Sequence, residues 1–237
     1  MLTFHDVGFQ YRGKKALFEG FDLQFKPGKT LVLGPNGAGK STLFHLAVGR
    51  EKPRAGQVET AGLSVSLMPQ HIPIFRSLSV REQVAYNAWL AGISEKDAWH
   101  LSSTCLEMVN LSEFADRSPN KISGGQLRRM GVASALATGS RVLLLDEPTA
   151  GLDLDQVAGF YQQLASLPGL HSIIVSSHQI EGIGDFYDHV VVINEGRVNF
   201  EGTFSEFVSV GYIDGTRSQG EALVNAFRKF TGKADQL

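Results

Sequence analysis

The sequence predicts an α/β fold with a parallel sheet between helices, an N-terminal antiparallel β subdomain and an inserted α-helical subdomain. From residue 142 to 193, continuous apolar segments alternate with helical patterns, which is typical of buried parallel strands joined by crossover helices. At 34–39 a glycine-rich loop separates a buried apolar run from another helical pattern. Most of the stretch 71–138 has a helical pattern, so we expect it to interrupt the strands.

The composition is that of a folded globular chain with a substantial core: 237 residues, 43% of them hydrophobic and 19% charged. The formal charge of −2 provides no positive excess for nucleic acid, which we do not expect as a partner. The single cysteine, Cys105, excludes an internal disulfide and a cysteine-cluster metal site and favours a reducing compartment. Without a secretory leader or an apolar run near the roughly 18 residues of a membrane-spanning helix, the chain is expected to be cytoplasmic.

The first part of the chain predicts strands around one helix. Extended patterns cover residues 2–11 and 17–25, and a Lys-Pro-Gly-Lys turn separates the second from the buried run 30–33. An apolar helix is expected from Lys40 to about Val48, where Gly49 ends it. Two short strands are expected near 57–60 and 64–68.

The inserted region predicts helices. Ser79 and Glu82 have the spacing of a capping box, in which each side chain satisfies a free amide at a helix start. One face of this helix carries Val84, Ala85, Ala88 and Trp89. A second helix begins near Ser94 and turns Cys105 inward, so we interpret Cys105 as core packing and not as a nucleophile. A third helix is expected from about 125 to 138.

The second half of the chain predicts alternating strands and helices. Strands are expected at 142–146, 172–176 and 190–193, and helices at 154–167 and 179–187. Glu195 and Gly196 form an expected hairpin turn into a strand at 197–200. Two more capping boxes, Thr203 to Glu206 and Ser218 to Glu221, precede tail helices that we expect to pack on the domain.

Residues 34–41 fit the phosphate-loop pattern G-x-x-x-x-G-K-S, after a buried strand and at the start of a helix. The glycines allow a tight loop whose amides face phosphate oxygens, and the helix N-terminus adds positive potential. We expect Lys40 to reach the β and γ phosphates and the Ser41 hydroxyl to bind Mg²⁺. An ordinary glycine turn, the alternative, needs neither the lysine nor the hydroxyl. The expected phosphate contacts are Gly34, Pro35, Asn36, Gly37, Ala38, Gly39, Lys40 and Ser41.

The apolar strand Val142–Leu145 ends in two acidic residues. Next to a phosphate loop, Asp146 is placed to hold Mg²⁺ through water. Glu147, one residue further, is placed to orient and deprotonate an attacking water molecule. The alternative is that both are solvated residues at a strand end. The phosphate loop upstream favours the catalytic interpretation.

A third motif, Ile122-Ser123-Gly124-Gly125-Gln126, precedes a predicted helix. A serine and two glycines at a helix start form a second anion-binding surface, although small residues also serve simply as helix caps. Asn120-Lys121-Ile122 does not form the guanine-reading motif of GTPases, because that motif needs an aspartate where Ser123 stands.

With these motifs in this order, residues 1–205 resemble the nucleotide-binding subunit of an ATP-binding-cassette (ABC) transporter. The resemblance implies a P-loop NTPase core of the RecA-like type, with ATP and Mg²⁺ as cofactors. It implies that Tyr11 stacks on adenine, with a packed strand tyrosine as the alternative. It also implies nucleotide contacts from Thr42, Ser123, Gly124, Gly125 and Gln126.

The same resemblance gives roles to three further residues. Gln70 matches the glutamine that senses Mg²⁺ and the attacking water and couples them to the helical subdomain. His178 matches the histidine that contacts the γ-phosphate. Asp153 ends the inter-subunit loop 148–153 and is an expected nucleotide contact. The implied Mg²⁺ set is Ser41, Gln70 and Asp146, and the implied catalytic set is Glu147, His178 and Gln70.

The resemblance also implies a division of the chain. Residues 1–70 and 139–210 form the nucleotide-binding core with the β subdomain. Residues 71–138 form the helical and signature subdomain, and 211–237 form a helical tail. Within the helical part, residues 71–120 are expected to dock a membrane subunit.

The implied function is ATP hydrolysis, at sites shared by two cassettes packed head to tail, as a homodimer or a heterodimer. An integral membrane permease is the second expected partner, and it would hold the chain on the inner face of the cell membrane. The stretch Leu78–Gln83 looks like the bacterial drug and polysaccharide exporter branch, so export is expected. The alternatives are a soluble ABC-type ATPase that drives a non-transport process and a phosphate-loop nucleotide kinase.

Overall fold

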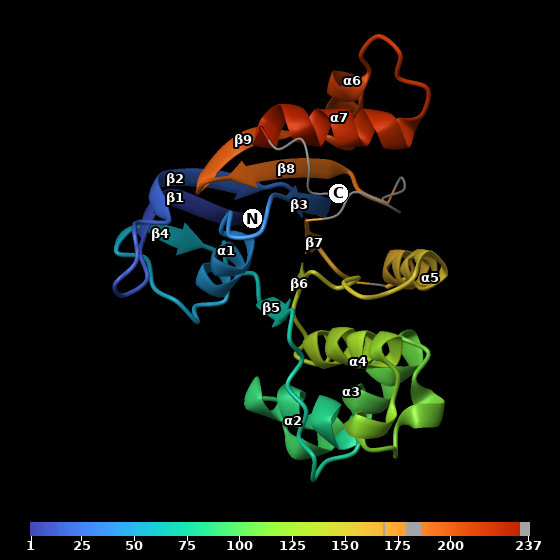
Figure 1. The fold of residues 1–237 in the computed structure, drawn as a ribbon. Helices are drawn as coiled ribbons and strands as arrows, with labels where there is room; N and C mark the ends of the chain where they lie inside the picture. The colour runs from blue at the N-terminus through green and yellow to red at the C-terminus, as the bar shows by residue number, and fades with distance from the viewer. Residues whose placement is uncertain (168, 179–185, 233–237) are drawn as a thin grey trace. The chain divides into compact units, whose positions relative to one another are not determined.

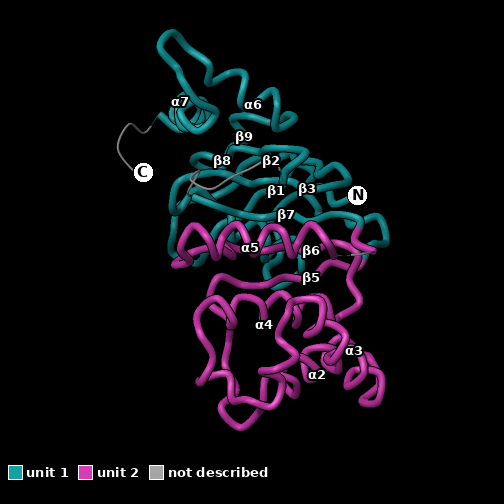
Figure 2. Tube along the Cα trace, turned by 90° about the vertical axis from the view of Figure 1, so that its right-hand side faces the viewer, with its two compact units in different colours: residues 1–63, 171–237 teal, residues 64–170 magenta. Residues whose placement is uncertain are grey.

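The computed structural model describes residues 1–167, 169–178 and 186–232 (Figure 1). The chain forms two compact units, one of residues 1–63 with 171–237 and one of residues 64–170 (Figure 2). In the described ranges, no helix combines the length and the apolar character needed to cross a bilayer.

The first unit begins with an antiparallel sheet. It consists of β1 (Leu2–Phe9), β2 (Phe18–Phe25) and β4 (Ala55–Glu59), in the order β2-β1-β4. Phe4 pairs with Leu23 on one side and with Val58 on the other. The Phe4 ring meets the rings of Phe21 and Phe25 edge to face, so aromatic packing fills the core below this sheet. The predicted N-terminal antiparallel β structure is therefore confirmed.

The second sheet of this unit has β3 (Gly28–Leu33) between β7 (Ser172–Ser177) and β8 (His189–Asn194), both parallel to it. Their continuous apolar runs are buried, as expected for a sheet covered on both faces. β9 (Arg197–Thr203) pairs antiparallel with β8. Glu195 and Gly196 both have positive φ, at 49° and 74°, which confirms the predicted tight hairpin turn.

The described residues of the first unit also include the helices α1 (Lys40–Ala47), α6 (Phe204–Gly211) and α7 (Gln219–Thr231). The last two pack on each other and on β8 and β9, which confirms a tail packed on the domain (Figure 1). The predicted box at Thr203 is present. At Ser218 half of the predicted box is present: the Ser218 hydroxyl accepts from the Glu221 amide, but the Glu221 carboxylate accepts from the Arg217 amide and not from that of Ser218. Most of the helix expected at 179–187 lies outside the described residues.

The second unit contains parallel strands and a helical part. β5 (Val65–Met68) pairs with β6 (Val142–Asp146), and α2 (Val80–Leu90), α3 (Glu95–Met108) and α4 (Gly124–Leu136) pack against one another. α5 (Leu154–Ala165) follows β6, and single 3₁₀ turns cover Ser112–Phe114 and Pro119–Lys121.

Two side chains of the helical part test the sequence analysis. Burial raises the pKa of the Cys105 thiol to about 11, so it stays neutral and packs in the core as predicted. Trp89 does not pack with the other residues of the predicted apolar face. It is 53% exposed and stacks on Tyr86, because α2 ends one residue later and leaves this turn at the surface.

Candidate functional site

The loop at residues 34–39 connects β3 to α1 in the first unit. The Ala38 amide donates to the Pro35 carbonyl over 3.1 Å and closes a turn. Gly39 caps α1 with a left-handed backbone at φ 108°. The Lys40 ammonium, only 5% exposed, donates to the carbonyls of Gly34 (2.7 Å) and Pro35 (3.3 Å). The loop therefore wraps around a cationic group at the start of a helix, an arrangement suited to phosphate.

Two glycines of the loop leave no space for a side chain. A Cβ at Gly34 would collide with the Ile193 carbonyl oxygen on β8. A Cβ at Gly39 would lie 2.8 Å from Cζ of Phe18, a buried ring on β2. The backbone of the loop is therefore in close contact with one strand of each sheet in this unit, β8 and β2.

The strand register places His178 at the same sheet edge as the loop. In the parallel pairing, Leu33 on β3 lies opposite Ser177 on β7. Gly34 and His178 are the next residues of their strands, so both leave the sheet at its carboxyl end. His178 is half-buried there.

Tyr11 lies beside the first turn of α1. Its hydroxyl is 3.1 Å from Oγ1 of Thr42, and the ring is edge-on to Phe9 at 4.8 Å. The residue is 38% exposed. Stacking on adenine stays a prediction.

The second unit brings Gln70 and the two acidic residues together. In the parallel pairing of β5 and β6, Met68 lies opposite Leu145, and Gln70 and Glu147 each follow two residues later. Nε2 of Gln70 donates to Oε2 of Glu147 over 2.7 Å. Asp146 is 3% exposed and Glu147 is 8% exposed, and Glu147 has a left-handed backbone at φ 47°. A non-glycine residue in that conformation stores strain, a feature that clusters at functional sites.

Arg128 joins this group from α4, although no sequence pattern indicates it. Its guanidinium donates from Nη1 to the Gln70 carbonyl and from Nη2 to the Ala150 carbonyl, the latter over 3.4 Å. Burial lowers the pKa of Arg128, and the carboxylates of Glu147 and Asp146 oppose that shift. We call Gln70, Arg128, Asp146 and Glu147 the carboxylate cluster.

The signature residues form the N-terminus of α4. Oγ of Ser123 accepts from the Gln126 amide (3.2 Å), and Oε1 of Gln126 accepts from the Ser123 amide (2.8 Å). Gly124 is exposed. A Cβ at Gly125 would lie 3.3 Å from Oε1 of Gln156 on α5, so the two helix starts approach closely. The capping box presents a rigid, positively polarised helix start.

Asp153 caps α5 with both carboxylate oxygens. Oδ1 accepts from the Gln156 amide (2.8 Å) and Oδ2 accepts from the Gln156 side chain (2.6 Å). The carboxylate is exposed. Its structural role is therefore shown, and its contact with a nucleotide stays a prediction.

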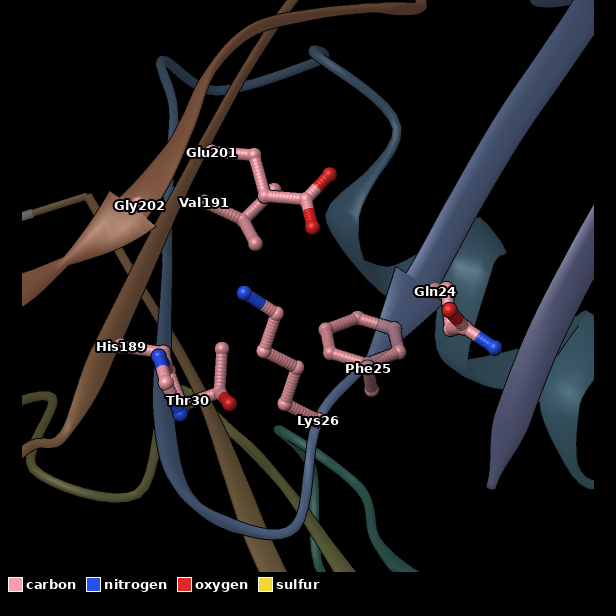
Figure 3. Close-up of a pocket in the computed structure, with 8 residues that line it drawn as sticks. All are labelled: Gln24, Phe25, Lys26, Thr30, His189, Val191, Glu201 and Gly202. Atoms are coloured by element: carbon pink, nitrogen blue, oxygen red, sulfur yellow. The ribbon is translucent and has the colours of Figure 1, made fainter.

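A separate pocket in the first unit contains no predicted site residue. It is lined by Gln24, Phe25, Lys26, Thr30, His189, Val191, Glu201 and Gly202. Figure 3 shows the Lys26 side chain extending toward Val191 and Glu201. The predicted residues instead gather in three places: loop 34–41 with Tyr11, Thr42 and His178; the carboxylate cluster; and the starts of α4 and α5.

Mg²⁺ prefers oxygen ligands and usually keeps several waters. The predicted donors supply such oxygens: the hydroxyl of Ser41, the carboxylate of Asp146 and the side-chain carbonyl of Gln70, whose amide nitrogen is used by Glu147. Among the described residues, no cluster of three or more His, Cys, Asp or Glu side chains forms a metal cage. Each of these groups is a kind of ligand that a hydrated, phosphate-bound Mg²⁺ accepts, and their meeting at one ion stays a prediction, since Ser41 belongs to the first unit and the other two to the second.

Comparisons with known proteins agree with these motifs. A protein-family model described as "ABC transporter" matches residues 18–150. The methionine import ATP-binding protein MetN of Caulobacter vibrioides is 36% identical over 230 residues, which cover 87% of this chain and 68% of that protein. The energy-coupling factor transporter ATP-binding protein EcfA of Methanothermobacter thermautotrophicus is 33% identical, with 86% and 71% covered.

A solved structure shows the same fold. The dimeric bacterial ABC transporter cassette MJ0796 superimposes with a TM-score of 0.75 at 24% identity, over 86% of this chain and 98% of that one. The predicted α/β fold with a P-loop NTPase core is thereby confirmed.

Proposed function

The chain belongs to the ABC transporter family as an ATP-binding subunit with ATPase activity, and from this premise we propose that it hydrolyses MgATP in a head-to-tail dimer to drive uptake through a separate membrane permease. One observation carries the proposal: the 2.7 Å hydrogen bond between Gln70 and Glu147. It connects the proposed catalytic base to the residue immediately before the segment 71–120, which contains the proposed docking surface.

Glu147 is the general base. It accepts a proton from water as the water oxygen bonds to the γ-phosphorus, and the bond from that phosphorus to the bridging oxygen of ADP breaks. Gln70 donates to Oε2 of Glu147 and so fixes the orientation of the carboxylate that accepts the proton. The buried position of Glu147 keeps competing solvent away from it.

ATP binds by its phosphates to loop 34–41, where Lys40 and the α1 N-terminus supply positive charge. Thr42 extends the phosphate contacts of the loop, Tyr11 stacks on the adenine ring, and His178 faces the γ-phosphate from the end of β7. Ser41, Gln70 and Asp146 hold Mg²⁺, which when bound neutralises phosphate charge.

Each ATP is shared between two chains. Within the described residues, loop 34–41 and the signature each precede a helix start suited to anions, α1 and α4, and the proposed acid pair is Asp146 with Glu147. Ser123 to Gln126, with Asp153, therefore serve the nucleotide of the partner subunit. The fold shared with a dimeric cassette supports this arrangement.

Mixing two inactive variants, Lys40→Ala and Ser123→Arg, tests the shared site. In a mixed dimer, one site carries both lesions and the other combines an intact loop with an intact signature. ATPase activity or ATP-dependent dimerisation should return on mixing. Mixed dimers that form but restore neither would contradict the shared site.

The docking surface is an exposed apolar patch in the segment 71–120. Its members are Ile74, Phe75, Tyr86, Trp89 and Leu90. Tyr86 contacts Phe75 edge to face at 5.6 Å and stacks on Trp89 at 5.8 Å. The Gln83 side chain holds the loop below the patch by bonding Pro73 and Phe75. Rigid aromatic side chains at a surface are typical of protein interfaces.

This patch begins four residues after Gln70, so a permease that moves it acts on the catalytic pair. The permease also holds the chain at the inner face of the membrane. We keep the division proposed from the sequence: core at 1–70 and 139–210, helical subdomain at 71–138 and tail at 211–237.

Uptake replaces the export expected from Leu78–Gln83. The comparisons support neither export nor a non-transport ATPase, whereas the relative MetN is named an import protein. Membership of the ABC transporter family likewise replaces the nucleotide-kinase alternative.

Trp89→Ala tests the docking surface, with Tyr212→Ala as the control because Tyr212 is equally exposed (53%) but lies after α6. Trp89→Ala should lose co-purification with the permease and the transport-coupled ATPase while basal ATPase remains. Cross-links from the permease to the tail alone would contradict this surface.

A further inference from the structure

Arg128 connects three segments of the second unit. It lies on α4, five residues or about one and a half turns after Ser123. Its guanidinium reaches the backbone carbonyl of Gln70 on one side and of Ala150 on the other. The planar guanidinium bonds these two carbonyls from two different nitrogens, Nη1 and Nη2, whereas a lysine would have to bond both from one nitrogen.

The surroundings make this contact more than a surface hydrogen bond. Arg128 is half-buried, and the carboxylates of Glu147 and Asp146 act on its charge. Gly131, one turn further along α4, has no side chain to keep Ile72 away, so the segment that follows Gln70 packs tightly on the helix. The Gln70 backbone is therefore held to α4 at two neighbouring points.

We propose that Arg128 is a positioning residue for ATP hydrolysis: it holds the Gln70 backbone so that the Gln70 amide stays on Glu147, and it links that pair to the helix that begins at Ser123. This inference rests on the proposed roles of Glu147 and Gln70. Arg128 itself touches neither the base nor, in the proposed reaction, the reacting atoms.

Through Arg128, a movement at the start of α4 can be transmitted to Gln70 and Glu147. In the proposed dimer Ser123 faces the nucleotide of the partner subunit, and Ala150 lies in the loop that leads to Asp153. Because α4 is a single helix from Gly124 to Leu136, a displacement of its first turn is carried to Arg128. When the signature of one chain contacts the ATP bound to the partner's phosphate loop, the displacement of α4 therefore changes the position of Gln70 and Glu147 in the first chain. That pair acts on the ATP bound to the first chain's own phosphate loop.

The test compares Arg128→Gln and Arg128→Lys with Arg141→Gln in the purified full chain. Arg141 is an exposed arginine that precedes the opposite end of β6 and serves as the matched control. Arg128→Gln should lower kcat about tenfold with an unchanged KM, because positioning of the pair matters only in the transition state. Arg128→Lys keeps the charge and should recover part of the loss. A kcat of Arg128→Gln equal to that of Arg141→Gln overturns the proposal.

A double-mutant cycle with Gln70→Ala separates positioning from folding. If Arg128 acts through Gln70, its substitution should cost much less in the Gln70→Ala background than in the wild type. An equal loss in both backgrounds, together with a lowered unfolding temperature, means a structural role and overturns the proposal.

Glu147→Gln separates the proposal from its premise. If Glu147→Gln keeps its turnover, the proposed base is wrong. If Glu147→Gln loses turnover while Arg128→Gln does not, the positioning role alone is wrong.

Discussion

The phosphate loop of the first unit and the carboxylate cluster of the second are assembled in opposite ways. In the loop, Lys40 donates to backbone carbonyls five and six positions away, so the contacts form within one short stretch of backbone. In the cluster, side chains meet across 77 positions from Gln70 to Glu147 and 58 from Gln70 to Arg128. The loop is suited to binding phosphate, and the cluster to moving a proton. Substitutions should therefore separate affinity from turnover.

Glu147→Gln gives the largest expected effect. The amide fits the same space but cannot take a proton, so turnover should fall about 100-fold or more. The dissociation constant for ATP should not change, because the loop is intact. Phosphate release and equilibrium binding of ATP measure the two quantities, and near-normal release would show that Glu147 is not the base.

Lys40→Ala should show the reverse pattern. Loss of a charged hydrogen-bond donor should weaken ATP binding by about 10- to 100-fold. Lys26→Ala, a lysine before the opposite end of β3, is the control and should bind ATP normally. An unchanged ATP dissociation constant for Lys40→Ala would remove the distinction between the two regions.

Gly39→Ala tests the backbone of the loop, with Gly49→Ala as its matched control. Both glycines have positive φ, but only Gly39 faces a ring, since a Cβ at Gly49 has nothing within 4 Å. Gly49→Ala should cost about 1 kcal/mol of stability from strain alone. Gly39→Ala should cost about 2 kcal/mol more, because the buried Phe18 ring cannot move away. Denaturant unfolding measures both, and equal losses would show that the contact with Phe18 is unimportant.

Ser79→Ala gives the smallest expected effect. It removes the hydroxyl that caps α2, which should cost about 1 kcal/mol in the unfolding free energy. Thr203→Ala removes the same kind of cap from α6 in the other unit and should cost a similar amount. ATP affinity should stay normal in both variants, and altered affinity in either would mean that its cap helps to form the site.

The two regions also differ in how far sequence predicts them. Loop 34–41 is contiguous, and its glycines, lysine and hydroxyl stand at the spacing their contacts need. The pair Gln70 and Glu147 required the family resemblance, because nothing local to Gln70 indicates a partner 77 positions away.

Arg128 could not be predicted for the same reason. An arginine on a helix indicates a solvated face, and only the close packing of α4 on the Gln70 segment brings it to two carbonyls. Apolar runs predicted β6 and β7 well because every residue of these two strands is buried. Trp89 was wrongly predicted to pack with the apolar face of its helix, and it is exposed. Helical periodicity shows which face a residue lies on but not whether another element covers that turn of the helix.

The most direct test of this division between binding and turnover is a crystal structure of the Glu147→Gln variant with ATP and Mg²⁺. The expected result is a dimer with the phosphates in loop 34–41, residue 147 facing the γ-phosphate, and Ser123 of the partner subunit closing the site. A nucleotide bound within one chain, with residue 147 away from the γ-phosphate, would contradict it.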